Sequence, residues 1–269
     1  YENNNGTWTQ IGSDIDGESS SDYFGWSVSL SEDGSVVAIG AQRDDDAASD
    51  SGHVRIYENN NGTWTQIGSD IDGESSSDYF GWSVSLSEDG SVVAIGAQRD
   101  DGTSTDAGHV RVYENNNGTW TQIGSDIDGE SSYDYSGSAV SLSADGSVVA
   151  IGAYLNDGGS TNSGHVRVYE NNNGTWTQIG SDIDGESSSD YFGWSVSLSE
   201  DGSVVAIGAQ RDDDAASDSG HVRIYENNNG TWTQIGSDID GESSSDYFGW
   251  SVSLSEDGSV VAIGAQRDD

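Results

Sequence analysis

Three observations predict an all-β fold, a β-propeller of four-stranded antiparallel blades. First, a 56-residue unit recurs along the 269-residue chain, at 1–56, 57–112, 113–168, 169–224 and, in part, 225–269. Second, each unit holds four short segments of strand character separated by turns rich in Gly, Asn, Asp and Ser, with no helical periodicity. Third, a four-stranded unit cannot cover both of its faces alone, so neighbouring units must stack. The whole chain, 1–269, is therefore expected to form one repeat array of about five blades. A β-solenoid and a string of separate sandwiches are the alternatives.

The first unit shows why each segment is expected to be a strand. Residues 8–12 follow an Asn-Gly turn, and residues 24–30 alternate large apolar with small polar side chains, the period of a sheet with two different faces. An Asp-Gly turn then leads into residues 35–41, a nearly continuous β-branched run typical of a strand buried on both sides. Residues 53–57 alternate again and complete the set.

Most of the units are nearly identical, and the third differs most. Residues 169–224 repeat 1–56 without a change, whereas the third unit carries YDYSGSAVSLSADG at 133–146 and so lacks the Phe and Trp of the others. The order of variants indicates a larger repeat of three units. The chain is therefore expected to be a window on a longer tandem array.

Charge limits the classes of partner. The chain has 8 Lys+Arg against 48 Asp+Glu, a formal net charge of −40, and its basic residues are all Arg. Such a surface repels nucleic acid and anionic membranes, so neither binding to nucleic acid nor direct membrane insertion is expected. No segment is long and apolar enough to span a bilayer. Cations, and neutral or basic surfaces, are the natural partners.

One stretch of each unit resembles a known family. The sequence FGWSVSLSEDGSVVAIGAQ at 24–42, followed by GHVRIY at 52–57, resembles the FG-GAP repeat of integrin-α-type β-propellers. The resemblance implies that 24–30 is the inner strand of a blade, 35–41 the second, 52–57 the third and 64–68 the outer one. It also implies calcium binding in the turn between the first two strands, but here that turn keeps only the central Asp-Gly of the family's D-x-D-x-D-G-x-x-D pattern.

A different loop offers alternating carboxylates. In the connection between blades, acidic residues occupy positions 1, 3, 5 and 9 of a nine-residue stretch, called here the acidic window. Calcium takes six to eight oxygen ligands from flexible loops, so this spacing predicts a calcium site, with a solvated acidic loop as the alternative. The predicted ligands are Asp14, Asp16, Glu18, Asp22, Asp70, Asp72, Glu74, Asp78, Asp126, Asp128, Glu130, Asp134, Asp182, Asp184, Glu186, Asp190, Asp238, Asp240, Glu242 and Asp246.

The strand order places these windows and the loop at 43–50 on one face. The opposite face carries an Asn-Gly-Thr sequence that is both a favoured hairpin turn and an N-glycosylation acceptor. The candidate glycosylation sites are Asn5, Asn61, Asn117, Asn173 and Asn229.

The repeated histidines, tryptophans and arginines are expected to be structural. His53 and Arg55 recur in every third strand, where identical copies a blade apart cannot converge, so we expect them to pair with carboxylates between blades. Trp8 and Trp26 are expected to pack between blades rather than to form a sugar-stacking platform.

No catalytic motif is present in the sequence, and identical repeats do not supply the dissimilar groups that an active site needs. The sequence therefore predicts a non-enzymatic extracellular or cell-surface structural or adhesive repeat protein, with calcium as its candidate ion. Its expected partners are copies of itself or neighbouring repeats in a fibre. Alternatives are a multivalent propeller that binds glycans or surface proteins, and an artificial consensus repeat.

Overall fold

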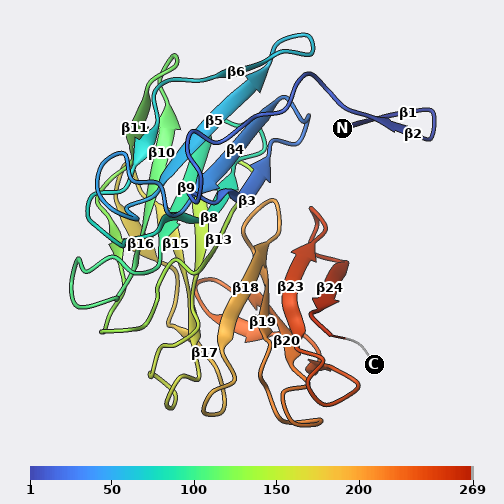
Figure 1. The fold of residues 1–269 in the computed structure, drawn as a ribbon. Coiled ribbons are helices and arrows are strands. Elements are labelled where there is room, and N and C mark those ends of the chain that lie inside the picture. Colours follow the sequence, from blue (N-terminus) through green and yellow to red (C-terminus); the bar gives the residue numbers. More distant parts are fainter. Residues whose placement is uncertain (268–269) are drawn as a thin grey trace.

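The computed structural model describes residues 1–267 and arranges them as an arc of blades around a common axis (Figure 1). Four blades are complete, and a strand pair lies at each end of the arc. Within the described residues every regular element is a strand, and no helix there is able to cross a membrane. The predicted fold class, an all-β propeller of antiparallel blades, is confirmed, and the arc is open in this part of the chain.

Each complete blade has four strands in chain order, with a short fifth strand that also pairs with the third. Blade one is β3 (Phe24–Leu30), β4 (Val36–Ala41), β5 (His53–Asn59), β6 (Trp64–Gln66) and β7 (Ile71–Asp72). Blade two is β8 (Phe80–Leu86), β9 (Val92–Ala97), β10 (His109–Asn115), β11 (Trp120–Gln122) and β12 (Ile127–Asp128). Blade three is β13 (Ala139–Leu142), β14 (Val148–Ala153), β15 (His165–Asn171), β16 (Trp176–Gln178) and β17 (Ile183–Asp184). Blade four is β18 (Phe192–Leu198), β19 (Val204–Ala209), β20 (His221–Asn227), β21 (Trp232–Gln234) and β22 (Ile239–Asp240).

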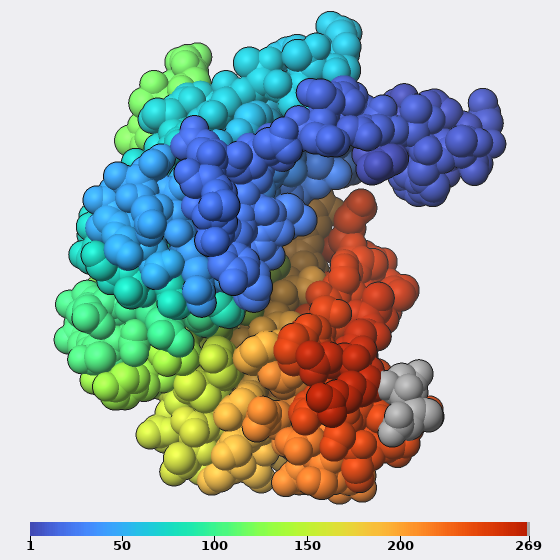
Figure 2. Space-filling view, in the orientation of Figure 1, coloured from blue at the N-terminus to red at the C-terminus, as the bar shows by residue number. Residues whose placement is uncertain are grey.

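The remaining strands form two separate pairs. The hairpin β1 (Glu2–Asn4) and β2 (Thr7–Thr9) corresponds in sequence to the outer part of a blade, and β23 (Phe248–Leu254) with β24 (Val261–Ala265) to the inner part. Figure 2 shows the blue hairpin projecting from the arc, away from the red strands. The four strand segments expected in each unit are present, but the short strand represented by β7 was not predicted because two residues carry no periodic signal.

The apolar core lies between the blades. In the junction of blades one and two, Val54 and Ile56 of β5 pack with Phe80, Val93 and Ile95 of the next blade, and all five are buried. The second strand of a blade is covered on both sides, which explains its unbroken apolar run. Burial between neighbouring sheets is what makes a single blade dependent on the next one.

Glycine allows the blades to approach closely. A Cβ atom on Gly96 of β9 would lie 2.1 Å from the carbonyl oxygen of Gly137 in the following blade, and 2.4 Å from Ser83 Oγ. The equivalent Gly40 and Gly208 meet Gly81 and Gly249 in the same way. Ser83 Oγ also donates a hydrogen bond of 2.8 Å to the Gly137 carbonyl. Backbone therefore touches backbone at each of these junctions.

A second set of bonds joins the blades nearer the axis. The Glu32 amide donates to the Glu88 carbonyl at 2.9 Å, and the Glu88 amide donates to the Ala144 carbonyl at 2.8 Å. On the outside, Trp120 Nε1 donates to the Ile67 carbonyl of the preceding unit at 2.9 Å. This outer tryptophan, equivalent to Trp8, thus packs between units as expected.

The third blade compensates for the residues it lacks. Ser138 stands where the other blades have Trp26, Trp82 or Trp194. Tyr154, at the end of β14, lies 4.8 Å from Trp194 and 5.4 Å from Tyr191 between ring centroids. An aromatic ring is therefore kept at this position, although it comes from another strand.

The loops divide between two faces as predicted. Amides of the connection between blades one and two bond to the 43–51 loop, as in Ser77 to Ser49 at 2.9 Å and Phe80 to Ser51 at 2.9 Å. On the opposite face, the Asn59 amide bonds to the Ser35 carbonyl at 2.8 Å. The acidic windows therefore share a face with the 43–51 loop, and the Asn-Gly turns share the other face with the Asp-Gly turns.

The glycine contacts lead to a first prediction. Gly96→Ala inserts a methyl group against a backbone carbonyl that cannot move independently, so the free energy of unfolding should fall by about 2–3 kcal/mol. Urea denaturation followed by tryptophan fluorescence measures this loss. Gly102→Ala is the matched control, because Asp46 and Asp214 already occupy the equivalent position in two other blades. Equal stability of the two variants would contradict the proposed role of Gly96.

Candidate functional site

The first and third residues of successive acidic windows hold a buried arginine. Arg111 of β10, whose side chain is 4% exposed, contacts Glu74 through Nη2 and Asp126 through Nε, the latter at 3.1 Å. Glu74 lies in the connection leading into this blade, and Asp126 lies after its outer strand. Gln122 Nε2 also donates to Asp126 at 2.6 Å. The predicted pairing of the strand arginines with carboxylates is confirmed, and it ties the inter-blade connections to the sheet.

These charges are strongly coupled to their surroundings. Burial alone disfavours the charged form of Arg223, but the hydrogen bonds that it donates to Asp238 and Glu186 outweigh burial and raise its pKa. Conversely, the hydrogen bond from Arg223 lowers the pKa of Asp238. Both partners therefore remain charged, and removal of Asp238 would leave the buried Arg223 with Glu186 as its remaining partner in this pair of contacts.

The second and fourth residues of the window have other neighbours. Asp72 belongs to β7 and pairs through its backbone with His53 of β5. Asp78 is buried, and its Oδ2 accepts the Ser75 amide at 2.7 Å, which closes the turn that ends the window. Burial, and after it the neighbouring Asp100, raises the pKa of Asp78 to about 6.

The same division is repeated in the other windows. The fourth residue caps the turn in all five copies, at Asp22, Asp78, Asp134, Asp190 and Asp246. The third residue contacts a strand arginine in four copies, at Glu18, Glu74, Glu130 and Glu186. The third and fourth carboxylates of a window therefore have different partners, an arginine and the amide of a turn. The first two, as in Asp70 and Asp72, lie near one histidine.

Acidic groups with a histidine are the clusters that can hold a metal ion. In blade one the candidate ligand atoms of Asp44, Asp46 and His53 lie within 4.8 Å of one another, as do those of His53, Asp70 and Asp72. Blade four repeats the first group with Asp212, Asp214 and His221. The sequence reasoning missed these groups because it treated the histidines only as ion-pair partners and the windows as separate loops.

An arc of aromatic and arginine side chains follows the inner strands of the blades on the acidic face. Arg43 stacks over the rings of Tyr23 and Tyr79, at 5.1 and 5.5 Å, and Arg99 stacks over Tyr79 and Tyr135 at the same distances. The Trp26 and Trp82 ring centroids lie 5.0 Å apart. This aromatic–arginine rim consists of Tyr23, Trp26, Arg43, Tyr79, Trp82, Arg99, Tyr135, Tyr154, Tyr191, Trp194, Arg211, Tyr247, Trp250 and Arg267.

The backbone under this rim is strained at its tyrosines. Tyr79 and Tyr191 have φ of 57° and 59°, the left-handed region that bulky residues seldom adopt. Such strain is typical of functional positions, where surrounding contacts hold it in place. From blade three to the β23–β24 pair, the rim borders a cavity of about 430 Å³. Its lining includes Tyr154, Trp194, Gln210, Arg211 and Trp250. The inner tryptophans contact one another between blades, as predicted, but the rim was not predicted from the sequence.

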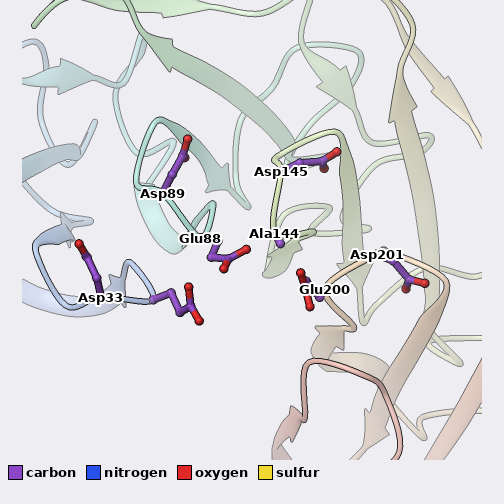
Figure 3. Close-up of a pocket in the computed structure, with 8 residues that line it drawn as sticks. Asp33, Glu88, Asp89, Ala144, Asp145, Glu200 and Asp201 are labelled. Carbon is purple, nitrogen blue, oxygen red and sulfur yellow. The ribbon is translucent and has the colours of Figure 1, made fainter.

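The other end of the axis is lined by carboxylates. Glu32, Glu88, Glu200 and the Asp-Gly turns border a cavity of about 670 Å³. Figure 3 shows Glu88 and Glu200 extending into this space, with Ala144 between them in the third blade. The hydrogen bond and charge of Glu32 raise the pKa of Glu88 to about 7. We call this cavity the axial carboxylate pocket. It is bordered by the turns between the first two strands of each blade, where the family resemblance implied calcium although only the central Asp-Gly of the family's pattern is kept.

The Asn-Gly turns are exposed hairpin turns, as predicted. Asn61 and Gly62 have φ of 53° and 85°, so both central residues lie in the left-handed region that a two-residue hairpin requires. The Asn60 amide and the Thr63 carbonyl close the turn at 2.8 Å. The acceptor asparagines Asn5, Asn61, Asn117, Asn173 and Asn229 are all exposed.

The blades and the repeated loop sites together define a β-propeller repeat protein. A family model described as FG-GAP repeat matches residues 14–57, 70–113, 182–225 and 238–269, more than half of the chain. The chain therefore belongs to the FG-GAP repeat family, as the sequence resemblance indicated. The third unit, with Ser136-Gly137 in place of Phe-Gly, lies outside the matched segments.

Solved structures support the fold at low sequence identity. A Bacteroides uniformis ATCC 8492 protein described as a candidate 6-phosphogluconolactonase is 14% identical, with a TM-score of 0.55 over 88% of this chain and 57% of its own. Hydrazine synthase of Kuenenia stuttgartiensis is 12% identical, with a TM-score of 0.53 over 90% of this chain and 70% of its own. The chain thus spans just over half the length of the first of these. A search of curated protein sequences found no match.

The axial carboxylate pocket leads to a second prediction. Because the folded protein binds a proton at Glu88 more tightly than the unfolded chain does, the contribution of Glu88 to stability is fully present below its unfolded pKa and is lost as pH rises through about 7. Glu88→Gln should remove part of this decline in melting temperature between about pH 5 and about pH 8. Glu58→Gln, which removes one charge from an exposed strand end, is the control. An identical pH dependence for all three proteins would be evidence against carboxylate crowding at the axis.

Proposed function

We propose that the protein is a non-enzymatic structural or adhesive repeat protein of the cell exterior, in which propeller blades serve as a scaffold. One observation carries the proposal: the junctions of successive blades use the same contacts. The same glycine approach, the same tryptophan hydrogen bond and the same arginine clamp recur from blade to blade. Such equivalence favours assembly and multivalent contact, with copies of the chain or neighbouring repeats as partners.

The chemistry of the surface supports the same role. FG-GAP repeats are generally non-enzymatic and typical of extracellular or surface proteins, and the resemblance to the enzymes above concerns the fold alone. The exposed turns at Asn61 and its equivalents are accessible acceptors, so we propose N-linked glycans on the face opposite the acidic windows. A net charge of −40 keeps such a protein soluble and disfavours nucleic-acid partners.

Calcium is the ion that FG-GAP repeats often bind, and the acidic face suits it in donor type. Asp78 and Asp100 are both buried, and burial together with the charge of Asp100 raises the pKa of Asp78; burial and Asp212 act on Asp190 in the same way. We propose that calcium associates with the carboxylates of the acidic windows and of the 43–51 loop and its equivalents. Bound calcium would supply positive charge that reduces repulsion across this face and allows acidic surfaces of separate copies to approach.

The scaffold proposal leads to a third prediction. Millimolar calcium should raise the melting temperature, because a ligand that binds only the folded state stabilises it, and it should promote ordered assemblies visible by negative-stain electron microscopy. Magnesium at equal ionic strength controls for simple screening. Unchanged melting in calcium would refute the calcium proposal, and monodisperse single particles at high protein concentration would refute the scaffold proposal.

The aromatic–arginine rim favours a second candidate function, the binding of neutral saccharides. Trp194 and Trp250 lie 4.9 Å apart at the edge of the 430 Å³ cavity, and Arg211 and Gln210 offer polar groups beside them. Aromatic faces accept the apolar face of a sugar ring, while guanidinium and carboxamide groups bond its hydroxyls. The strongly negative protein would repel acidic glycans, so neutral sugars are the fitting class.

This candidate leads to a fourth prediction. A neutral oligosaccharide should bind the wild-type chain in a glycan array, and Trp194→Ala should weaken that binding about tenfold, since one aromatic platform contributes 1–3 kcal/mol in comparable stacking contacts. Trp8→Ala is the control, because Trp8 is 67% exposed on the β1–β2 hairpin, outside the rim. An array without hits at high protein density would exclude saccharide binding.

A further inference from the structure

The structure assigns a second kind of metal site, for a divalent transition ion of the zinc class, to the histidine–aspartate pocket of blades one and four. In blade one, Asp44 and Asp46 of the loop after β4 form one group with His53 at the start of β5, and Asp72 of β7 belongs to a second group with the same histidine. In blade four, Asp212 and Asp214 form the equivalent group with His221, and Asp240 of β22 pairs with His221 through its backbone.

The histidine points to a ligand independently of the carboxylates. His53 is 1% exposed and makes no hydrogen bond through either ring nitrogen, although its Nδ1 lies 3.1 Å from Asp44 Oδ1. In blade four, His221 Nδ1 likewise lies 3.1 Å from Asp212 Oδ1, an ion-pair distance, while its Nε2 has no hydrogen-bond partner. A buried ring nitrogen without a hydrogen-bond partner is costly, and metal coordination by the histidine removes that cost.

The aspartates converge on the same space from two segments. In blade two, a Cβ atom on Gly102 would lie 2.8 Å from Asp100 Oδ1 and 3.3 Å from Asp128 Oδ1. Asp46 occupies this position in blade one, so its side chain starts between the carboxylates equivalent to these, Asp44 and Asp72. The nearby arginine does not compete for them, because Arg55 is engaged by Glu18 and Asp70.

The donor set selects the ion. One imidazole nitrogen and three carboxylate oxygens suit zinc and similar divalent ions, which accept mixed nitrogen and oxygen ligands in four-coordinate sites. Calcium prefers six to eight oxygens and gains little from imidazole. The ion of this pocket therefore differs from the calcium proposed for the wider acidic face, although Asp44, Asp46 and Asp72 belong to both sets.

The chain contains its own controls. Blade two keeps Asp100 and His109 but has Gly102 in place of Asp46, and blade three has Asn156 and Gly158 in place of both loop aspartates. Because each pocket loses one donor or more, binding should be weaker in blade two and weakest in blade three. Strong sites are thus expected only in the two blades whose loops are identical in sequence.

The test is a zinc titration of the chain, without a histidine tag, by calorimetry and by metal analysis after dialysis. The wild-type protein should hold one zinc ion in blade one and one in blade four, in the presence of millimolar calcium. Asp46→Gly with Asp214→Gly gives both loops the residue that blades two and three already tolerate, so folding should be preserved while zinc affinity falls about tenfold or more. His53→Gln with His221→Gln should have the same effect.

Three results would overturn the inference. The first is no zinc bound at stoichiometric protein concentration, which would leave the histidines in simple ion pairs with Asp44 and Asp212. The second is zinc affinity unchanged in the glycine double variant. The third is complete displacement of zinc by millimolar calcium, which would assign the pocket to calcium. Failure of the calcium-dependent stabilisation described above would leave these results unaffected, so the two ions are tested separately.

Discussion

The close approach of each second strand to the first strand of the next blade is the contact on which the rest of the structure depends. At Gly96 and its equivalents, there is no room for a single methyl group beside the neighbouring carbonyl. This distance brings Phe80, Val93 and Ile95 into one buried layer with Val54 and Ile56. It also sets the spacing of everything attached to the strand ends, including the aromatic rim on one side and the carboxylate turns on the other.

The few positive charges of the chain belong to two groups of arginines that have different partners. The arginines of the third strands are buried between carboxylates and link the connections between blades to the sheets, as Arg111 does for Glu74 and Asp126. The arginines of the rim lie instead against tyrosine rings, as Arg43 does. The remaining carboxylates have few cationic neighbours. Burial raises the pKa of Asp78, and the hydrogen bond and charge of Glu32 raise the pKa of Glu88. The two proposed kinds of bound cation, calcium at the acidic face and a transition ion in the buried histidine–aspartate pocket, would each reduce that excess of negative charge.

The fold could be predicted from the sequence because its signals are local and repeated. Alternation in 24–30, the β-branched run of 35–41 and the Asn-Gly turns each specify their own conformation, and the 56-residue period supplies the stacking. The sites were less accessible because they depend on which loops meet. Spacing within one window suggested that its carboxylates act together, whereas Glu74 reaches the following blade and Asp72 faces His53. Likewise the rim joins equivalent residues of adjacent blades, such as Trp26 with Trp82, and no period within one unit reveals such a contact.

The substitution in the third blade has a geometric consequence. Were all blades alike, the rim would look the same after rotation by one blade, and a bound molecule could settle in several equivalent orientations. Tyr154 and Leu155 replace the Gln-Arg pair found in the other blades, and Ser138 replaces the inner tryptophan. The rotational equivalence is thereby broken at one point on the circumference. The rotational orientation of a partner bound to the rim is therefore determined by the position of the third blade.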